Sequence, residues 1–429
     1  MLVTLIVVFF VALIIGLPVF LTMYAAVFAV ISNSGGIAMT MLPQLIYNGM
    51  NSFPILAVPL FVLASDLMTE GKITDMLIDF ANAGLGHIRG GLGHVNVLIS
   101  MLFGGVSGSA VADAAGPSKI VMFMMRKAGY DKYYSGAVTV ASSVIGIIIP
   151  PSIPMVIYAL SDGRTSTLGL FAAGYLPGFL IGFSLMLVNG YISYKNGYRF
   201  TTEKASLRTR LISFMQAIPG LLMPVIIIGF TVAGITTATE AAAIAVAYAL
   251  FVGLLITRKL KVNMLYKILF QSGIVSAAIL MIIGMGSLFS WILTYTRIPQ
   301  QIATFLATLT SNPTLILFLM ALLVILTGML VDTIPAVMIL APIISSIGLS
   351  FGINPFQTAM VVIIGIGIGM MTPPIAPLMF ITSSIGKLRM EKLIKETLPF
   401  IAVEVIVLVL VILIPQLTTW LPALLGYGA

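Results

Sequence analysis

Long apolar runs separated by short polar connections are the feature of this sequence that most limits its fold. Hydrophobic residues make up 60% of the 429 residues and charged residues only 8%, which is more apolar surface than the core of a soluble domain needs. A membrane-spanning helix takes about 20 apolar residues. The sequence therefore predicts an all-α polytopic membrane protein with roughly ten to a dozen membrane-depth segments. The expected segments are 2–32, 43–68, 92–125, 134–161, 168–194, 212–233, 236–257, 271–296, 313–347, 355–385 and 397–420.

Several classes of function are excluded by residues that the sequence lacks. It has no cysteine, which excludes thiolate metal centres, iron–sulfur clusters, disulfides and cysteine nucleophiles. With only two histidines, His87 and His94, an imidazole metal site is not expected. The stretch Gly105-Val-Ser107-Gly108 fits the short pattern of rhomboid-type intramembrane proteases, but both histidines precede this serine and no later base is available. No phosphate-binding loop motif occurs either, so the chain is not expected to be an enzyme.

Positive charge is concentrated in short connections between the apolar runs. The net charge of +8 would fit a nucleic-acid partner, but this distribution argues against one. Lysine and arginine in short loops are instead typical of the cytoplasmic side of a membrane protein. The basic residues are Arg126, Lys127 and Lys132; Lys195, Arg199, Lys204, Arg208 and Arg210; Arg258, Lys259, Lys261 and Lys267; and Lys387, Arg389, Lys392 and Lys395.

Two apolar runs contain a pair of adjacent prolines in the same context. Gly146-Ile-Ile-Ile-Pro-Pro-Ser-Ile-Pro154 and Gly369-Met-Met-Thr-Pro-Pro-Ile-Ala-Pro377 share the spacing G-x-x-x-P-P-x-x-P. Proline removes a backbone donor and clashes with the preceding turn, so two in a row end a helix. We therefore expect two discontinuous helices, in which the carbonyls of 146–149 and 369–372 lack partners within the helix.

Two other runs have a polar centre and are predicted to be re-entrant helical hairpins. The centres are Gly104-Gly-Val-Ser-Gly-Ser-Ala110 and Gly328-Met-Leu-Val-Asp-Thr-Ile-Pro335. Backbone that is not helical is tolerated at membrane depth only against protein or a wet cavity. Each hairpin is therefore expected to place its polar tip inside the protein.

The two proline motifs are 223 residues apart in the sequence, from Pro150 to Pro373. Shifting the sequence by this number aligns the two motifs and several residues around them. Counting spans from the basic loops, the first hairpin opens from the inside and the second from the outside. The sequence thus predicts an inverted-topology repeat, which in many secondary transporters forms its site at broken helices near the midplane. The shift carries Gly105 onto Gly328, Ser109 onto Asp332, Gly146 onto Gly369, Pro151 onto Pro374 and Pro154 onto Pro377.

Each hairpin tip, together with its broken helix, is a candidate cation site. Hard cations such as sodium prefer oxygen ligands, and unwound carbonyls hold them in transporters. The tips add the hydroxyls of Ser107 and Ser109 in the first hairpin, and Asp332 and Thr333 in the second. The alternative is that the prolines are simple kinks tolerated by packing, because proline and glycine are common in membrane helices. Two motifs at matched spacing, each preceded by a polar tip, favour the site.

Four acidic residues lie inside apolar runs, where an ionisable group is a functional candidate by default. Asp332, at a predicted hairpin tip, has the strongest case. Glu240 begins a helix, where it could cap the helix or serve as a gate, and the sequence leaves both open. Asp113 is expected to pair with Lys119 in a structural role. Glu404 is expected near the membrane interface or paired across helices.

Arg297 follows Trp291 and Tyr295 and is expected at the outer face. It could anchor the chain at the interface or recognise an anionic substrate, and the sequence does not separate the two.

Several stretches together resemble the large membrane subunit of tripartite ATP-independent periplasmic (TRAP) transporters. The resemblance covers nearly the whole chain, and its glycine–serine hairpin and Thr-Glu-Ala-Ala-Ala segment are quite specific. The tip Val331-Asp-Thr-Ile-Pro-Ala336 is similar to the sialic-acid branch, although Pro335 lies further from the acid than is usual in the family. The matching stretches are Gly16-Leu-Pro-Val19, Gly104-Gly-Val-Ser-Gly-Ser-Ala-Val-Ala-Asp113, Ile149-Pro-Pro-Ser-Ile153, Thr239-Glu-Ala-Ala-Ala-Ile-Ala245 and Thr372-Pro-Pro-Ile-Ala-Pro377.

The resemblance implies partners, coupling and ligands that composition does not reveal. A periplasmic binding protein would deliver the substrate, and a small four-helix membrane subunit would pack on the scaffold. Transport would be coupled to sodium, with an elevator movement of the hairpin-bearing domain. Family substrates are mostly small carboxylates, including sialic acid and C4-dicarboxylates. The two sodium sites of the family correspond to Ser107, Ser109, Gly146, Ile149 and Pro151, and to Gly328, Asp332, Gly369, Thr372 and Pro374.

We therefore expect the large subunit of a sodium-coupled importer in the bacterial inner membrane, with a small organic anion, sialic acid above all, as its substrate. The scaffold is expected at 1–86 and 199–300, and the transport domain at 87–198 and 301–429. Asp332, Glu240 and Arg297 are the candidates for substrate binding or gating. One alternative is a C4-dicarboxylate permease of the same family. The alternative from another class is a stand-alone channel or permease that needs no binding protein.

Overall fold

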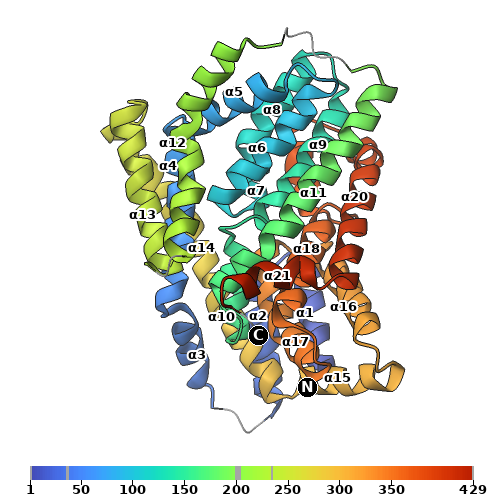
Figure 1. Ribbon diagram of the computed structural model, residues 1–429. Coiled ribbons are helices and arrows are strands. Elements are labelled where there is room, and N and C mark those ends of the chain that lie inside the picture. Colours follow the sequence, from blue (N-terminus) through green and yellow to red (C-terminus); the bar gives the residue numbers. More distant parts are fainter. Residues whose placement is uncertain (1, 35–37, 199–203, 233–234, 428–429) are drawn as a thin grey trace.

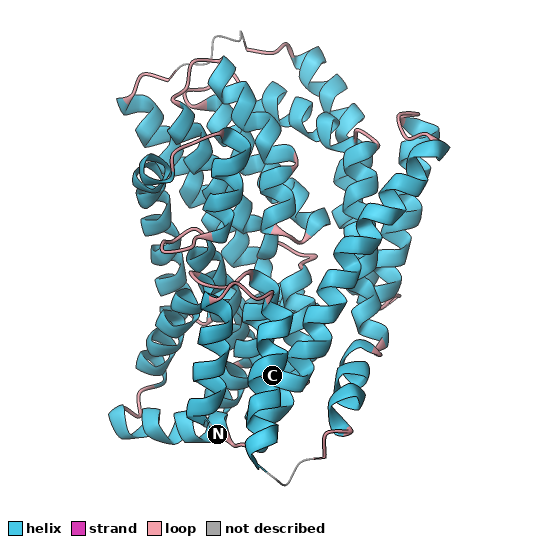
Figure 2. Ribbon diagram, turned by 180° about the vertical axis from the view of Figure 1, so that it is seen from behind, coloured by secondary structure: helices cyan, strands magenta, loops and turns pink. Residues whose placement is uncertain are grey.

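The chain forms a bundle of helices in the computed structural model, which describes residues 2–34, 38–198, 204–232 and 235–427. Within these ranges every regular element is a helix (Figures 1 and 2). One position named above, Arg199, lies outside the described residues. Both ends of the chain lie in the lower half of the molecule as drawn in Figure 1.

Seven of the described helical segments are long and apolar enough to cross a bilayer, which agrees with the predicted multi-pass membrane protein. Seven shorter apolar helices accompany them, because glycine and proline divide several of the predicted runs. The seven long segments are η1 and α4 together (Phe53–Leu56 and Ala57–Glu70), α11 (Thr167–Lys195), α12 (Leu207–Val232), α13 (Ala238–Phe251) with the π turn η3 (Val252–Ile256), α14 (Val262–Tyr295), α17 (Thr333–Ser350) and α20 (Met390–Leu413).

One group of helices is built around α4, α12, α13 and α14. Helix α4 packs against α13 and α14, and α12 packs against α13. Figure 1 shows α12 and α13 along the left-hand side of the molecule. The helices that complete this group are α1 (Leu2–Ile14) and α2 (Val19–Ser34), which pack together, α3 (Met41–Met50) on α14, and α5 (Ile73–Leu85) on α12.

A second group surrounds α9 and α18. Helix α20 packs against α9, α11 and α18, while α16 packs against α18. In Figure 1, α6 to α9 fill the upper half of the molecule and α15 to α17 the lower half. The remaining helices are α6 (Gly91–Ser107), α7 (Ala110–Ala115), α8 (Pro117–Lys127), α9 (Lys132–Val144) with the 3-10 turn η2 (Ile145–Ile147), α10 (Ile153–Asp162), α15 (Ile298–Leu309), α16 (Pro313–Gly328), α18 (Pro355–Met370), α19 (Pro377–Gly386) and α21 (Gln416–Leu424).

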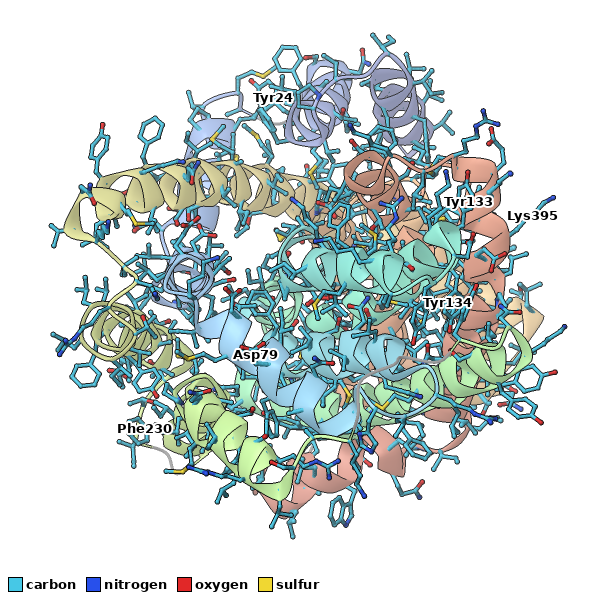
Figure 3. All side chains as sticks on the ribbon, turned by 90° about the horizontal axis from the view of Figure 1, so that it is seen from above. Tyr24, Asp79, Tyr133, Tyr134, Phe230 and Lys395 are labelled. Carbon is cyan, nitrogen blue, oxygen red and sulfur yellow. The ribbon has the colours of Figure 1, made fainter. Side chains whose placement is uncertain are left out.

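Several basic loops meet at the upper end of the molecule. The Arg126 guanidinium donates a hydrogen bond to the Gly386 carbonyl at 2.8 Å, which joins the end of α8 to the end of α19. The Lys392 ammonium lies 5.5 Å from the ring centroid of Tyr133. Seen from above, Tyr133 and Tyr134 of α9 lie beside α20, which carries Lys395 (Figure 3). The basic stretches around Arg126 and around Lys392 are therefore neighbours in space.

Candidate functional site

The first candidate site is the junction between the end of α6 and the break after α9. Helix α6 ends at Ser107, Gly108 has φ 61°, and the Ser109 hydroxyl caps α7 by accepting the Ala112 N–H at 3.3 Å. A Cβ on Gly108 would lie 2.9 Å from the Pro151 carbonyl oxygen, so glycine is required by close approach as well as by its positive φ. This turn is packed directly on the broken helix.

The break itself lies at the paired prolines, as predicted. After η2 the chain is not helical until α10 begins at Ile153. The Ser152 hydroxyl donates to the Ile147 carbonyl at 2.7 Å and accepts the Met155 N–H at 3.3 Å. The Ile153 N–H donates to the Gly108 carbonyl at 3.2 Å, which ties α10 to the turn after α6. The peptide bond between Pro150 and Pro151 is cis.

The second candidate site is the junction between the end of α16 and the break after α18. The Asp332 carboxylate caps α17 by accepting the Thr333 N–H at 2.7 Å. The Thr333 hydroxyl contacts the Met370 sulfur at 2.7 Å, and the Ala376 N–H donates to the Met329 carbonyl at 3.4 Å. The peptide bond between Pro373 and Pro374 is cis. The end of α16, the cap of α17 and the break after α18 therefore meet in one place.

The two junctions are built alike. A Cβ on Gly104 would lie 3.0 Å from the Gly146 Cα, and one on Gly328 would lie 3.2 Å from the Gly369 Cα. In both places backbone meets backbone, which a side chain at either glycine would prevent. Ser109 and Asp332, 223 residues apart, both cap the helix that follows the tip.

Some of the carbonyl groups that were expected to lack hydrogen-bonding partners before the prolines have one. The Ile147 oxygen accepts the Ser152 hydroxyl, and the Gly369 oxygen accepts the Thr372 N–H at 2.8 Å. The prediction that these carbonyls lack partners within the helix is wrong for Gly369, whose oxygen accepts a backbone N–H in the last turn, whereas the partner of Ile147 comes from beyond the prolines. A carbonyl oxygen has two lone pairs, so each can still accept a second partner.

The structure brings the proposed ligands together in the two expected sets. The first set lies at the junction of α6, α7 and the break after α9, and the second at the junction of α16, α17 and the break after α18. Ser107 is buried, whereas the Asp332 side chain is exposed. The first set is Ser107, Ser109, Gly146, Ile149 and Pro151, and the second is Gly328, Asp332, Gly369, Thr372 and Pro374.

Glu240 and Arg297 are not linked to either junction by a hydrogen bond of the described residues. Glu240 forms a capping box with Thr237, whose backbone N–H donates to the carboxylate at 2.7 Å. This geometry favours the helix cap over the gate. Arg297 is exposed before α15, with φ 54°, and borders an open hollow of about 500 Å³ along that helix.

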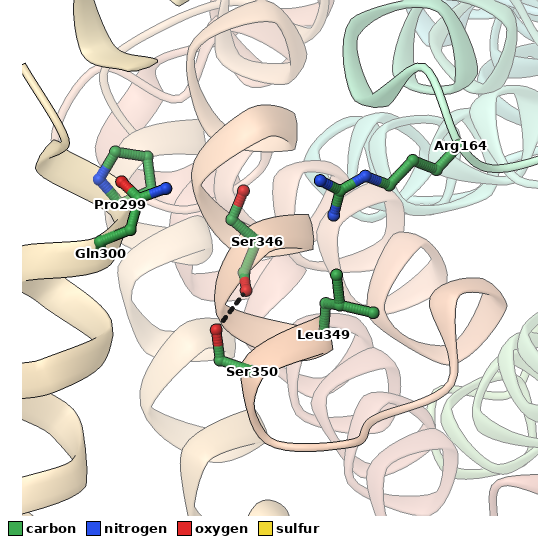
Figure 4. A pocket seen from close by; sticks show the side chains of 6 residues that line it. All are labelled: Arg164, Pro299, Gln300, Ser346, Leu349 and Ser350. Atoms are coloured by element: carbon green, nitrogen blue, oxygen red, sulfur yellow. Dashed lines mark hydrogen bonds between the residues drawn. The ribbon is translucent and has the colours of Figure 1, made fainter. Parts of the chain in front are cut away.

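Sequence reasoning missed a polar hollow beside α15. It measures about 140 Å³ and lies between α15, α17 and the loop after α10 (Figure 4). The Ser350 hydroxyl donates to the Ser346 carbonyl at 2.9 Å within it. Arg164, at its edge, is an isolated arginine in a loop, so no sequence pattern marks it. The lining residues are Arg164, Pro299, Gln300, Ser346, Leu349 and Ser350.

Two buried acidic residues do not have the partners expected for them. The Asp113 carboxylate accepts hydroxyl hydrogen bonds from Ser100 at 2.7 Å and Ser118 at 2.8 Å, while Lys119 is exposed. The expected pairing of Asp113 with Lys119 is therefore wrong. Glu404 is fully buried, and neither carboxyl oxygen has a hydrogen-bonding partner among the described residues. The expected pairing of Glu404 across helices is therefore wrong within the described residues.

Comparison with known proteins identifies the family. Residues 6–417 match the family described as the DctM component of the tripartite ATP-independent periplasmic transporters. The sialic acid TRAP transporter large permease protein SiaM of Vibrio cholerae is 38% identical over 96% of each chain. The C4-dicarboxylate TRAP transporter large permease protein DctM of Pseudomonas aeruginosa is 36% identical over 87% of each chain.

A likeness of fold extends to a more distant transporter. The crystal structure of the Alcanivorax borkumensis YdaH transporter superimposes on this chain with a TM-score of 0.63 and 14% sequence identity. The match covers 92% of this chain and 90% of the YdaH chain.

These matches confirm the resemblance deduced from the sequence motifs. The relatives are named as transporter permeases, so the prediction of a non-enzyme is confirmed. A multi-pass membrane location agrees with the seven candidate spans, and the inner membrane follows from the family. The chain belongs to the DctM component family, the large membrane permeases of the TRAP transporters.

Proposed function

We propose that this chain is the large transmembrane subunit of a sodium-coupled importer of a small organic anion. The observation that carries the proposal is the pair of matched junctions, each formed by a polar helix turn and a helix broken at two prolines. A simple proline kink would not require the glycine contacts that pack each turn against its break. Two such junctions, 223 residues apart, are better explained by a cation-binding site that occurs twice than by two independent kinks.

The donor set at each junction fits sodium. The first offers the Ser107 and Ser109 hydroxyls with the carbonyls around Gly146 and Ile149, and the second adds the Asp332 carboxylate. All these groups are oxygen ligands, which hard cations prefer, and helix ends at membrane depth hold such ions in transporters. Sodium would be a co-substrate, taken up on one side and released on the other.

The arrangement of helices supports inverted repeats that move as an elevator. In Figure 1 the turn between α6 and α8 is approached from the upper end, and the turn between α16 and α17 from the lower end. We propose that both are re-entrant hairpins of one moving domain, 87–198 and 301–429, against a scaffold of 1–86 and 199–300. Packing of α9 on α20 and of α10 on α17 holds the two moving segments together.

The family context supports two protein partners and an anionic substrate. A small four-helix membrane subunit would cover part of the scaffold, and a periplasmic binding protein would deliver the substrate. The sialic-acid relative is 38% identical and the C4-dicarboxylate relative 36%, which supports sialic acid first. The difference is small, so a C4-dicarboxylate is the second candidate.

Uptake by proteoliposomes tests the proposal. Vesicles that contain this chain and the small subunit, with the binding protein added outside, should accumulate sialic acid only when sodium is higher outside. A potassium gradient of equal size is the control. Accumulation without the binding protein or the small subunit would instead establish a stand-alone permease.

A further inference from the structure

The polar hollow beside α15 has a cationic side chain at its edge and no acidic one among the described residues that line it. Arg164 supplies the charge, while Gln300 and Ser346 supply an amide and a hydroxyl group (Figure 4). All three can donate hydrogen bonds to a carboxylate. The volume of about 140 Å³ holds a carboxylate and the atoms next to it, but not a whole small molecule, whose site usually measures roughly 300–1,000 Å³. The hollow therefore fits the anionic end of a ligand.

Arg164 is held at this edge by the residues beside it in the loop after α10. The Asp162 carboxylate accepts the Thr165 N–H at 3.0 Å, as well as hydrogen bonds from the hydroxyls of Thr165 and Ser345. Ser345 belongs to α17, the helix that also carries Ser346. This carboxylate thus ties the loop to one wall of the hollow, and the arginine is in place without a ligand.

Arg164 has no partner for its charge in the part of the chain that the structure describes. The one ion pair there joins Lys72 to Asp75, and the Arg164 side chain makes no hydrogen bond. Asp162, the acid nearest to it in sequence, already accepts hydrogen bonds from the loop and from α17. Arginine presents five N–H donors in a planar fork that matches a carboxylate. Because Arg164 is exposed, this fork is free for an anion that arrives from outside.

A ligand that places its carboxylate on Arg164 has room to extend along α15. Gln300 lines both this hollow and the open one of about 500 Å³ beside the helix, so the two are neighbours. Amide and hydroxyl groups line much of the larger hollow, from Gln301, Thr304 and Thr308. Such groups both donate and accept hydrogen bonds, as the hydroxyls of a ligand require. A hydroxylated ligand therefore suits this surface better than an apolar one.

We propose that this surface receives the transported anion at the outer face, with the carboxylate of a hydroxylated acid on Arg164. The identity of the ligand, sialic acid, rests on the proposed function. Helix α15 lies at one end of the molecule and the basic loops at the other, so the positive-inside rule places α15 on the periplasmic side (Figure 1). The site is therefore separate from the two junctions and faces the side from which the anion is delivered.

The charge of the hollow can be measured with a single cysteine in the purified chain. The sequence has no cysteine, so Ser350→Cys places one thiol at the hollow. Ser350 is suitable because its hydroxyl already donates to the Ser346 carbonyl and is not free to donate to a ligand. A negatively charged methanethiosulfonate should react faster than a neutral one, with each rate taken relative to that of a small free thiol. Arg164→Gln should lower this preference about two- to fourfold, the effect of two unit charges roughly 5–10 Å apart in water.

Protection of the same thiol measures binding. Sialic acid should slow the reaction of Ser350→Cys with the neutral reagent, and Arg164→Gln should raise the half-protecting concentration about tenfold or more, the value of a hydrogen bond to a charged group. Arg164→Lys should recover part of the protection, because it keeps the charge but loses the planar fork. Ala307→Cys is the matched control and should not be protected, since Ala307 is exposed on α15 and lines neither hollow.

Four results would overturn the proposal. The first is protection of Ser350→Cys that is absent or does not depend on Arg164, and the second is equal slowing of Ala307→Cys. The third is equal protection by chloride or inorganic phosphate, which would show an unselective surface charge. The fourth is protection by the substrate-free binding protein but not by sialic acid, which would make this a docking surface for that protein.

Succinate tests the class of acid. It should protect more weakly than sialic acid, because it has no hydroxyl group for the amides and threonines along α15. Equal protection would instead assign a dicarboxylate that joins Arg164 to Arg297 of the larger hollow, and would overturn the hydroxylated acid. Loss of sodium dependence in uptake assays would contradict the proposed function alone, because the thiol measurements need neither sodium nor transport.

Discussion

Glycine at the two junctions is required by close approach of backbone to backbone. A Cβ on Gly369 would lie 2.5 Å from the Ile325 carbonyl oxygen and 2.7 Å from the Gly328 Cα, neither of which can rotate away. We expect Gly369→Ala to destabilise the protein by about 1–3 kcal/mol, the usual cost of overpacking. Thermal unfolding of the purified protein measures this.

The control for this substitution is Gly273→Ala on α14. No atom of the described residues lies within 4 Å of a Cβ placed there, so alanine should be neutral or slightly stabilising in this helix. Equal loss of stability in the two variants would show that the second junction is not tightly packed.

The charge of Asp332 can be separated from its role as a helix cap. Asparagine caps a helix about as well as aspartate, so Asp332→Asn should fold normally but raise the half-saturating sodium concentration about tenfold or more. Glu404→Gln is the matched control, because Glu404 is buried on α20 and its carboxyl group has no hydrogen-bonding partner in the part of the chain that the structure describes. Sodium-dependent uptake measures both, and equal, mild effects would argue against Asp332 as a ligand.

At the scale of elements, Ser152 both starts α10 and binds the end of η2. Ser152→Ala removes the cap and leaves the Ile147 carbonyl without its partner, so a loss of about 1–2 kcal/mol is expected. Ser152→Thr should retain most of the stability because it keeps the hydroxyl. Ser161→Ala removes a bond to the Ile157 carbonyl within the same helix and a contact with the Met338 sulfur, which is a weak acceptor, so it should cost less than Ser152→Ala. If thermal unfolding shows Ser152→Ala to be as stable as Ser161→Ala, the hydroxyl does not hold the break together.

The helix breaks could be predicted from sequence because proline and glycine act on their own backbone. The breaks after η2 and α18, and the turns at Gly108 and Asp332, fall where the motifs place them. What the sequence could not reveal is which side chains meet across helices. Helices that are apolar on all sides, such as α16, do not encode their rotation. Consequently the serines that bind Asp113 were missed, and the partners expected for Asp113 and Glu404 were wrong.

The local sequence also did not predict which groups donate hydrogen bonds to the backbone carbonyls at the helix breaks. Ser152 and Thr372 lie next to the prolines in the chain, but their hydroxyls bind the carbonyls of Ile147 and Ile368. Such bonds depend on backbone angles that the proline rule does not supply. Spacing was therefore enough to group the candidate residues around two helix breaks, whereas the partners of the carbonyls at each break required the structure.

For the whole molecule, the distribution of charge predicts its orientation in the membrane. The loops after α8, α11 and α19 gather at one end, and α15 lies at the other (Figure 1). The positive-inside rule places the basic end in the cytoplasm. Because the chain has no cysteine, single substitutions report their side of the membrane without background.

We expect Lys204→Cys and Lys261→Cys to react with a membrane-impermeant maleimide only in inverted vesicles. Gln300→Cys, exposed on α15, should react from the periplasm in intact cells. If either lysine position reacts from the periplasm while Gln300→Cys does not, the molecule is oriented the other way. If a lysine position and position 300 react from the same side, the spans between them have been counted wrongly. The opposite entry of the two helix turns, and with it the inverted repeat, would then have to be abandoned.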